Sequence, residues 1–195
     1  LIDAVNAVVA QLGPDGELIR AAANLGEVVD AELVAAVTGS NVLALLSVLD
    51  LAVARAVLIL DAEQYRFRHA LVREALASRT PLPRSAYLHR EAARVLEQRV
   101  GHDPLEIAHH ARLAGDLVHA ADALCRAAEA STSRFDRAAA EAFLDQAIAM
   151  HPAASRHEAR SRVRTMRGRY DDALADVERA LSLGAGATAL EAGSW

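Results

Sequence analysis

The chain has 195 residues, a formal net charge of −5, 53% hydrophobic residues and only 4% aromatic residues. This hydrophobic content excludes a disordered chain, and the many alanines and leucines favour packed helices over sheets. All 21 basic residues are arginines. Because a P-loop needs a lysine to reach the terminal phosphates, these residues cannot form a P-loop ATPase by themselves.

The cysteine content and the hydropathy of the chain indicate the cellular compartment to expect. Cys125 is the single cysteine, which excludes an intramolecular disulfide and favours a reducing cytoplasm. Asp50 and Arg55 interrupt the most apolar stretch, residues 42–60, so we expect no spanning helix and no membrane partner. The chain begins at Leu1 and has no signal-peptide pattern, and we expect it to be a fragment of a longer cytoplasmic protein.

The N-terminal part of the chain predicts short helices and one hairpin. Apolar spacing and the breakers Gly13-Pro14, Gly26 and Gly39 place helices over about residues 1–12, 15–25, 30–39 and 41–54, with Asp30 as an N-cap. The apolar run 57–60 and the alternating run 65–68 predict two strands joined by the polar loop 61–64. Another helix begins near His69. These parts predict a winged-helix-like domain over residues 1–82.

The remainder, residues 83–195, has the apolar period of helices throughout. Asp103 and Pro104 form a helix start. Ala140 recurs as Ala173 and Ala147 as Ala180, at a common spacing close to the period of the tetratricopeptide repeat, about 34 residues. We therefore predict a mainly α protein whose second domain is a tetratricopeptide-like α-solenoid, truncated at its C-terminus.

Three segments in this order resemble a known family. FRHALVREAL (residues 67–76), LHREAARVLE (88–97) and DPLEIAHHARLAGD (103–116) resemble the winged-helix domain and following helices of STAND-type signal-transducing NTPases, which include the large LuxR-type transcriptional regulators. The resemblance implies that the winged-helix unit docks on an NTPase domain of the same chain, which binds ATP or ADP. It also implies that the repeats take up an inducer or a protein partner.

Within this resemblance, His69 lies where relatives carry the histidine of their MHD motif, which faces the bound nucleotide. A histidine at a helix start can donate to a phosphate oxygen. Arg68 and Ala70 replace the methionine and aspartate of the motif. The alternative is that His69 caps its helix or packs under the hairpin.

A winged helix can bind DNA, so charge decides between DNA and protein partners. Residues 1–80 hold six arginines against ten acidic residues. Asp61 and Glu63 would repel phosphates from the loop of the hairpin, whereas the candidate recognition helix, residues 69–79, offers Arg73 and Arg79. We expect no direct nucleic-acid binding by this chain.

The most basic segment lies further on. Arg156, Arg160, Arg164 and Arg167 share one helix face at spacings of four, four and three residues. They predict a site for an acidic peptide, a phosphate-bearing ligand or a partner domain. The alternative is a solvated face neutralised in part by Glu158, Asp171 and Asp172.

No catalytic or metal-binding motif is evident. Glu106 and His110 are four residues apart, but a zinc site needs at least three ligands and no third has the required spacing. Cys125 has no basic neighbour placed to favour a thiolate, so it is expected to be a small buried side chain. The prediction is a non-catalytic signal-relay and protein-interaction region. A stand-alone helical-repeat scaffold and a DNA-binding winged-helix regulator are the alternatives.

Overall fold

The structure is a computed structural model that describes residues 13–192. The helix expected over residues 1–12 lies outside the described residues. The described part is mainly helical, with ten helices and one three-stranded antiparallel sheet. Its contacts divide it into two units. The first ends at His102 and also includes residues 113–115, and the second comprises residues 103–112 and the chain from Asp116 onward.

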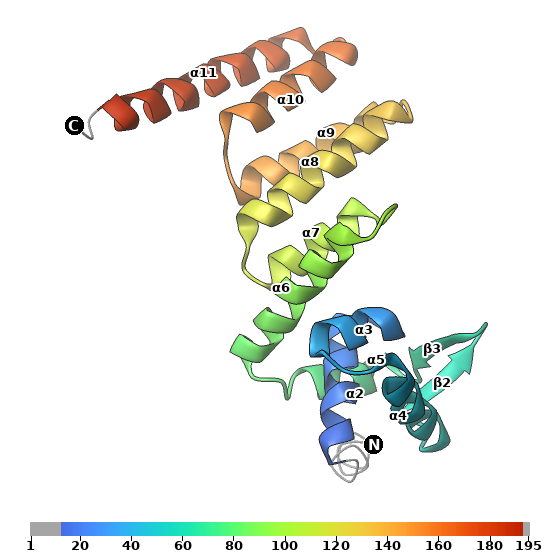
Figure 1. Cartoon of the computed structure of the whole chain (residues 1–195). Coiled ribbons are helices and arrows are strands. Elements are labelled where there is room, and N and C mark those ends of the chain that lie inside the picture. Colours follow the sequence, from blue (N-terminus) through green and yellow to red (C-terminus); the bar gives the residue numbers. More distant parts are fainter. Residues whose placement is uncertain (1–12, 193–195) are drawn as a thin grey trace. The chain divides into compact units, whose positions relative to one another are not determined.

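The first unit contains the sheet (Figure 1). Its elements are α2 (Pro14–Leu25), β1 (Val28–Val29), α3 (Ala31–Thr38), α4 (Val42–Ala54), β2 (Leu58–Asp61), β3 (Gln64–Phe67), α5 (Ala70–Ala77) and α6 (Leu82–Gln98). Side-chain caps fix two helix starts: Asp30 accepts from the Leu33 amide at 2.8 Å and Asn41 from the Leu43 amide at 2.9 Å. Gly39 ends α3 in the left-handed region, with φ of 68°.

The sheet has the strand order β1-β3-β2, with β3 antiparallel to both neighbours. Leu58 faces Phe67 and Asp61 faces Gln64, so the hairpin turn consists of Ala62 and Glu63 alone. Both have positive φ, 45° and 66°, as a two-residue type I′ turn requires. The sequence predicts a loop of four residues, 61–64, but Asp61 and Gln64 belong to the strands and the turn has only two residues. Strand β1, which has only two residues, was not expected.

One apolar core holds the first unit together. Fully buried side chains from α2, α3, α4, β2 and α5 form it, among them Ile19, Val34, Leu45, Leu49, Leu58, Val72 and Leu76. Phe67, the last residue of β3 and the first of the resembling segment 67–76, joins them, so burial fixes this end of the strand in the core.

Helix α6 belongs to this unit, whereas the sequence predicts a domain boundary after residue 82. Ser85 Oγ donates to Asn24 Oδ1 at 2.9 Å, and Arg99 contacts the Asp30 carboxylate at 2.6 Å. These bonds tie the two ends of α6 to α2 and to the start of α3. The division between the units falls near residue 102.

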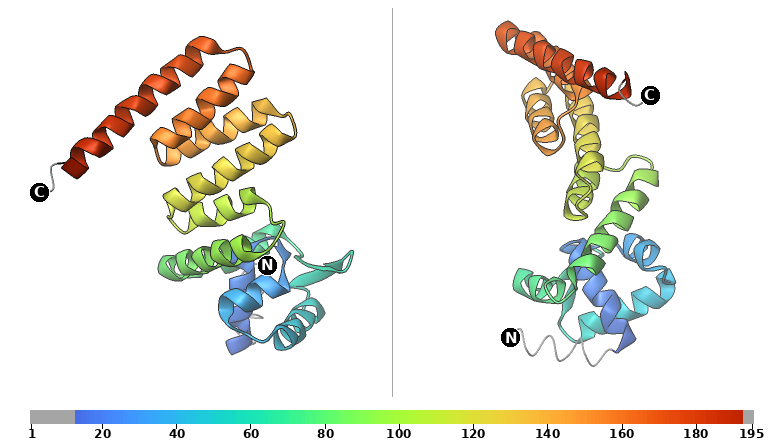
Figure 2. Two further views of the ribbon diagram at one scale, coloured as in Figure 1. Left: turned by 45° about the horizontal axis from the view of Figure 1, so that its top comes forward. Right: turned by 90° about the vertical axis from the view of Figure 1, so that its left-hand side faces the viewer.

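The second unit is entirely helical within the described residues. Its helices are α7 (Pro104–Leu113), α8 (Leu117–Ser133), α9 (Arg137–Met150), α10 (Ala154–Met166) and α11 (Tyr170–Ala192). Helices α8 and α9 form one antiparallel pair, α10 and α11 form another, and α9 also contacts α10 (Figure 2). Asp103, Asp116 and Asp136 cap α7, α8 and α9 through bonds of 2.9–3.0 Å to main-chain amides.

The turns inside the two helix pairs have the same geometry, at positions separated by the same spacing as Ala140 and Ala173. Phe135 and Gly168 both have positive φ, 62° and 75°. The Phe135 amide donates to the Thr132 carbonyl and the Gly168 amide to the Thr165 carbonyl, each at 3.0 Å. Ala140 and Ala173 are both buried, as are Ala147 and Ala180. The two helix pairs thus agree in turn geometry and in the burial of these alanines.

Helix α11 carries a row of exposed apolar side chains. Tyr170, Leu174, Val177 and Leu181 are exposed to between 40% and 68%, and their spacing of four, three and four places them on one face. This α11 row is unusual, because large apolar side chains at helical spacing are usually buried.

A separate finding concerns membranes. Among the described residues, no single helix has both the length and the apolarity needed to cross a bilayer. Helices α3 and α4 reach that apolarity only when taken together, across a bend of 119°.

Candidate functional site

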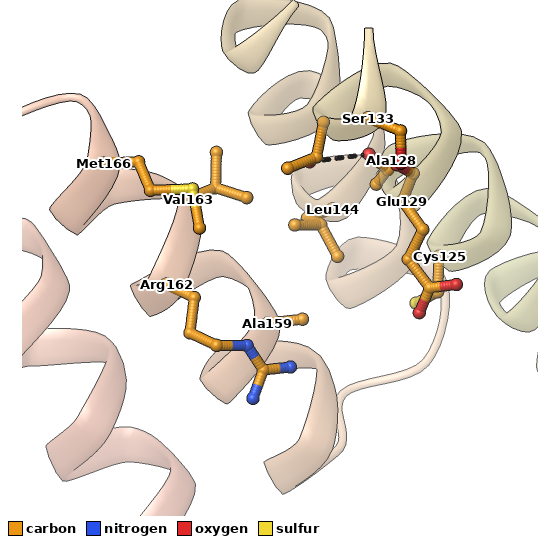
Figure 3. A pocket seen from close by; sticks show the side chains of 10 residues that line it. Cys125, Ala128, Glu129, Ser133, Leu144, Ala159, Arg162, Val163 and Met166 are labelled. Atoms are coloured by element: carbon orange, nitrogen blue, oxygen red, sulfur yellow. Dashed lines mark hydrogen bonds between the residues drawn. The ribbon is translucent and has the colours of Figure 1, made fainter. Parts of the chain in front are cut away.

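A pocket of about 290 Å³ opens between α8, α9 and α10 in the second unit (Figure 3). Small and aliphatic side chains form its apolar surface: Ala128, Leu144, Ala159 and Val163. Three of these, Ala128, Leu144 and Val163, belong to the buried core of the two helix pairs. Because two of the four are alanines, the helices leave space that larger residues would fill.

Polar groups stand at the rim of this pocket. Glu129 projects from α8 and Arg162 from α10, on opposite sides (Figure 3). Neither side chain forms a hydrogen bond or an ion pair with any residue described in the structure. By contrast, the Thr132 hydroxyl donates to the Ala128 carbonyl at 2.8 Å and the Ser133 hydroxyl to the Glu129 carbonyl at 3.0 Å. The groups available to a ligand are therefore one carboxylate and one guanidinium.

Cys125 also lines the pocket and is partly buried. Burial raises the pKa of its thiol, although the charge of Arg156 opposes the shift. The side chain is consequently a thiol at neutral pH, which is a poor nucleophile. Its place is a pocket wall rather than the fully buried position that the sequence predicts.

Next to the pocket, a buried carboxylate gathers three arginines. Glu141 of α9 is 3% exposed. It accepts from Arg164 Nε and from Arg169 Nη1, both at 2.7 Å, and from Arg167. Burial would raise the pKa of the Glu141 carboxyl, but the hydrogen bond from Arg164 and the charges of the three arginines outweigh it and lower that pKa.

A second buried carboxylate, Asp176 of α11, is 2% exposed. Arg160 donates to it through Nε at 3.0 Å and Nη2 at 2.5 Å, and Arg164 Nη1 lies 2.8 Å away. His157 Nδ1 is 3.1 Å from Asp176 Oδ1. Burial again opposes these partners, but the pKa of Asp176 is lowered, chiefly by the hydrogen bonds from Arg160 and His157.

The structure thus brings together three of the four arginines predicted to bind a partner. Arg160, Arg164 and Arg167 converge on Glu141 and Asp176, whereas Arg156 lies apart. Arg156 contacts Asp122 at 2.6 Å and the His151 carbonyl at 2.7 Å. Partner binding by these arginines stays a prediction, but each of them already has a carboxylate partner within the unit.

The acids that neutralise this face are mostly not the expected ones. Among Glu158, Asp171 and Asp172, only Asp172 forms an ion pair with an arginine in the described structure, at 2.7 Å from Arg169. Glu141 and Asp176 are distant in sequence from the arginines that they bind. Sequence spacing alone gives no sign of these pairs.

His69 occupies the N-cap position of α5 with extended backbone, φ −143° and ψ 136°. Its side chain forms no capping bond and is exposed, so it neither caps the helix nor packs under the hairpin. An exposed imidazole at this position is open to a ligand. Nucleotide sensing by His69 stays a prediction.

The adjacent histidines of α7 differ in exposure. His110 is 1% exposed, whereas the neighbouring His109 is exposed, as expected for adjacent positions on a helix. In the described part of the chain, no group of three or more His, Cys, Asp or Glu side chains is arranged to hold a metal ion.

Comparison with known proteins identifies no relative. No protein-family model matches the chain, and no curated protein matches it significantly. The geometry described above therefore carries the functional argument.

Arg162 is the site residue that the predicted cluster omits. It lies off the face shared by Arg156, Arg160 and Arg164, and it joins the pocket with Ala159 and Val163. The signal was present in α10, because Ala159, Val163 and Met166 follow one another at spacings of four and three. The sequence does not show that α8 lies opposite this row, so it does not reveal that the row lines a pocket.

Proposed function

We propose that this chain is a non-catalytic signal-relay and protein-interaction region of a multidomain STAND-type transcriptional regulator. The observation that carries the proposal is the order of two parts. A unit with the helix and strand order of a winged helix comes first, and two helix pairs with equivalent turns follow. In this proposal the second unit is a tetratricopeptide-like solenoid.

The surface of α4 supports docking on protein rather than DNA. In a winged helix, the helix before the hairpin is the one that enters the DNA groove; here that helix is α4, not the segment 69–79 that the sequence suggests. Its only charged residue is Asp50, so it offers no arginine to phosphate or base edges. Leu43 is 74% exposed, and Val42 and Leu51 are each 38% exposed. An exposed apolar helix face of this kind is typical of a protein interface.

The occupant proposed for this face is an NTPase domain in the same reading frame, whose P-loop would lie about 150–250 residues before Leu1, one domain length away. That domain, expressed separately, is expected to bind the chain. Leu43→Glu is expected to weaken binding at least about tenfold, because a carboxylate would be buried without a partner. Leu82→Glu is the matched control, since Leu82 is 85% exposed and lies on α6.

Two results would contradict this part of the proposal: a reading frame without an NTPase domain, which would favour a stand-alone scaffold, or equal weakening by both substitutions. Titration with duplex DNA at moderate salt is expected to give no binding. Salt-dependent DNA binding would favour the DNA-binding alternative.

For the helix pairs, the proposed ligand is a peptide or inducer that places an apolar group between α8 and α10. Glu129 and Arg162 would then bind its polar ends, because both groups lack partners in the described structure. A displayed library of random peptides is a suitable probe, with the reaction rate of the Cys125 thiol as readout. Selected peptides should slow that reaction, and Ala159→Trp, which fills the pocket, should abolish selection. Failure to enrich any peptide would contradict this part of the proposal.

A further inference from the structure

A second cavity, of about 500 Å³, lies in the first unit, where α2 meets the loop between α5 and α6. Three arginines from separate segments line it: Arg20 from α2, Arg79 from the loop and Arg84 from the first turn of α6. Thr80 and Pro81 complete the wall beside Glu17. Convergence of three guanidinium groups on one cavity creates a strongly positive site.

Glu17 is the single carboxylate among the residues that line this cavity. It is hydrogen-bonded to Arg20, and its second oxygen lies 2.5 Å from Arg84 Nη1. The hydrogen bond from Arg20 and the charges of Arg20 and Arg84 lower the pKa of Glu17, although its partial burial acts to raise that pKa. One negative charge thus faces three positive ones, and a formal excess of two positive charges remains.

Two groups in the cavity have donor capacity that no described residue uses. The Arg79 side chain is exposed and forms no hydrogen bond or ion pair with the described residues. Thr80 is 8% exposed, and its hydroxyl accepts from Asn24 Nδ2 at 2.8 Å. Because that contact uses an acceptor site of the oxygen, the Thr80 proton is free to be donated.

From this geometry we propose that the cavity binds the phosphate group of a small phosphomonoester. A phosphomonoester carries a charge close to −2 at neutral pH, which matches the excess of two. Its oxygens accept paired bonds from planar guanidinium groups, and the Thr80 hydroxyl supplies a further donor. The site is distinct from His69, because His69 precedes the N-terminus of α5 and Arg79 follows its C-terminus.

The test is calorimetric titration of the full chain at low ionic strength, with inorganic phosphate and glycerol phosphate as probes and glycerol as the uncharged control. Saturable binding with a dissociation constant below about 1 mM is expected for both phosphates, and none for glycerol. Binding of inorganic phosphate alone would overturn the assignment to a monoester. Absence of saturable binding by either phosphate would overturn the site.

Three variants test the residues. Arg79→Gln is expected to weaken phosphate binding about tenfold, since it removes a charge-assisted donor without breaking any contact within the described structure. Glu17→Gln is expected to strengthen binding, because it removes the carboxylate that competes for Arg20 and Arg84. Arg68→Gln is the matched control, an exposed arginine of the same unit that has no side-chain partner among the described residues. Equal weakening by Arg68→Gln and Arg79→Gln would show a general charge effect and overturn the proposal, as would weaker binding by Glu17→Gln.

Discussion

Arg164 joins two helices with a single guanidinium group. Its Nε donates to Glu141 of α9 and its Nη1 to Asp176 of α11. Removing charges from water is costly, and the cost is recovered only where geometry is good and most lone pairs have donors. Both conditions hold here, because each carboxylate accepts at least three hydrogen bonds and four arginines surround the two acids.

The lowered pKa values of Glu141 and Asp176 predict how stability depends on pH. Their ordinary values are 4.5 and 3.8, and folding lowers both. Folding is therefore stabilised by their ionised forms. This stabilisation is complete above about pH 5 and is lost as the pH falls through the folded-state values. Urea unfolding followed by circular dichroism should give a constant midpoint from pH 8 to about pH 5 and a fall at lower pH.

A matched pair of substitutions checks the cause of that acid limb. Glu141→Gln should reduce the free energy of unfolding by about 3–5 kcal/mol at pH 7, because it leaves arginines without their buried partner, and it should flatten the acid limb. Asp145, which is 50% exposed and contacts Arg160 at 2.6 Å, provides the control. Asp145→Asn should change stability by less than about 1 kcal/mol. An unchanged acid limb in Glu141→Gln would contradict this explanation.

At the scale of elements, the turn between α8 and α9 contains an unfavourable residue. Phe135 is held at φ of 62° although it is 82% exposed, so no burial offsets the strain of a left-handed conformation. In the second pair the same position is Gly168, which adopts this conformation without a Cβ penalty. The two turns differ in strain although their main-chain hydrogen bonds agree.

Exchanging glycine at these positions should change stability in opposite directions. Phe135→Gly should stabilise the chain by about 0.5–1 kcal/mol. It removes the cost of a left-handed conformation, about 1–2 kcal/mol, but glycine also increases the entropy of the unfolded chain, which offsets part of the gain. Gly168→Ala should destabilise by about 1 kcal/mol, through φ alone, since nothing lies within 4 Å of an added Cβ. Thermal unfolding measures both. A loss of stability in Phe135→Gly would show that the aromatic ring makes a contribution that exposure does not reveal.

Most elements of the fold follow from short-range signals. Asp30, Asn41, Asp103 and the glycines after α2 and α3 act locally, so the helix boundaries can be predicted within a few residues. Strand β1 could not be predicted, because two residues carry no periodic signal and the strand exists only through pairing of Val28 and Val29 with β3. The hairpin turn was predicted too long, because Ala62 and Glu63 are not the residues that usually mark a type I′ turn.

At the scale of the whole chain, the sequence does not predict that α6 belongs to the first unit. Pro81 and Pro83 suggest a boundary, because proline ends regular structure. In the structure Pro81 is instead the N-cap of α6, a position that proline tolerates. The bonds from α6 to Asn24 and from Arg99 to Asp30 join segments far apart in the sequence, which a local signal cannot reveal.

Two fragments test this division. The fragment of residues 13–102 should unfold cooperatively, whereas the fragment 13–82 should lose more than about 2 kcal/mol of stability, since it lacks the bonds to α6 and leaves polar partners without them. Guanidinium unfolding of both fragments provides the comparison. Equal midpoints would place α6 outside the first unit.

For the candidate site, the sequence predicts the arginines but not the groups that they contact or the pocket beside them. The arginine row on α10 is visible in the sequence, and its clustering on one face is observed for Arg160, Arg164 and Arg167. Its carboxylate partners lie on α9 and α11, so only the packing of three helices reveals that the charges cancel. The pocket beside them depends on the absence of bulk at Ala128 and Ala159, and an absence of bulk has meaning only once neighbouring helices are placed.

The offset that relates Ala140 to Ala173 also pairs Glu141 with Leu174 of the α11 row. Glu141 is a buried acid that binds Arg164 of α10, whereas Leu174 is a leucine that is 59% exposed. An arginine packed against Leu174 would therefore lose its hydration without gaining a carboxylate partner, which costs free energy. The two helix pairs share their turn geometry but carry unlike side chains at this position: a buried acid that neutralises arginines in the first, and an exposed leucine that cannot do so in the second.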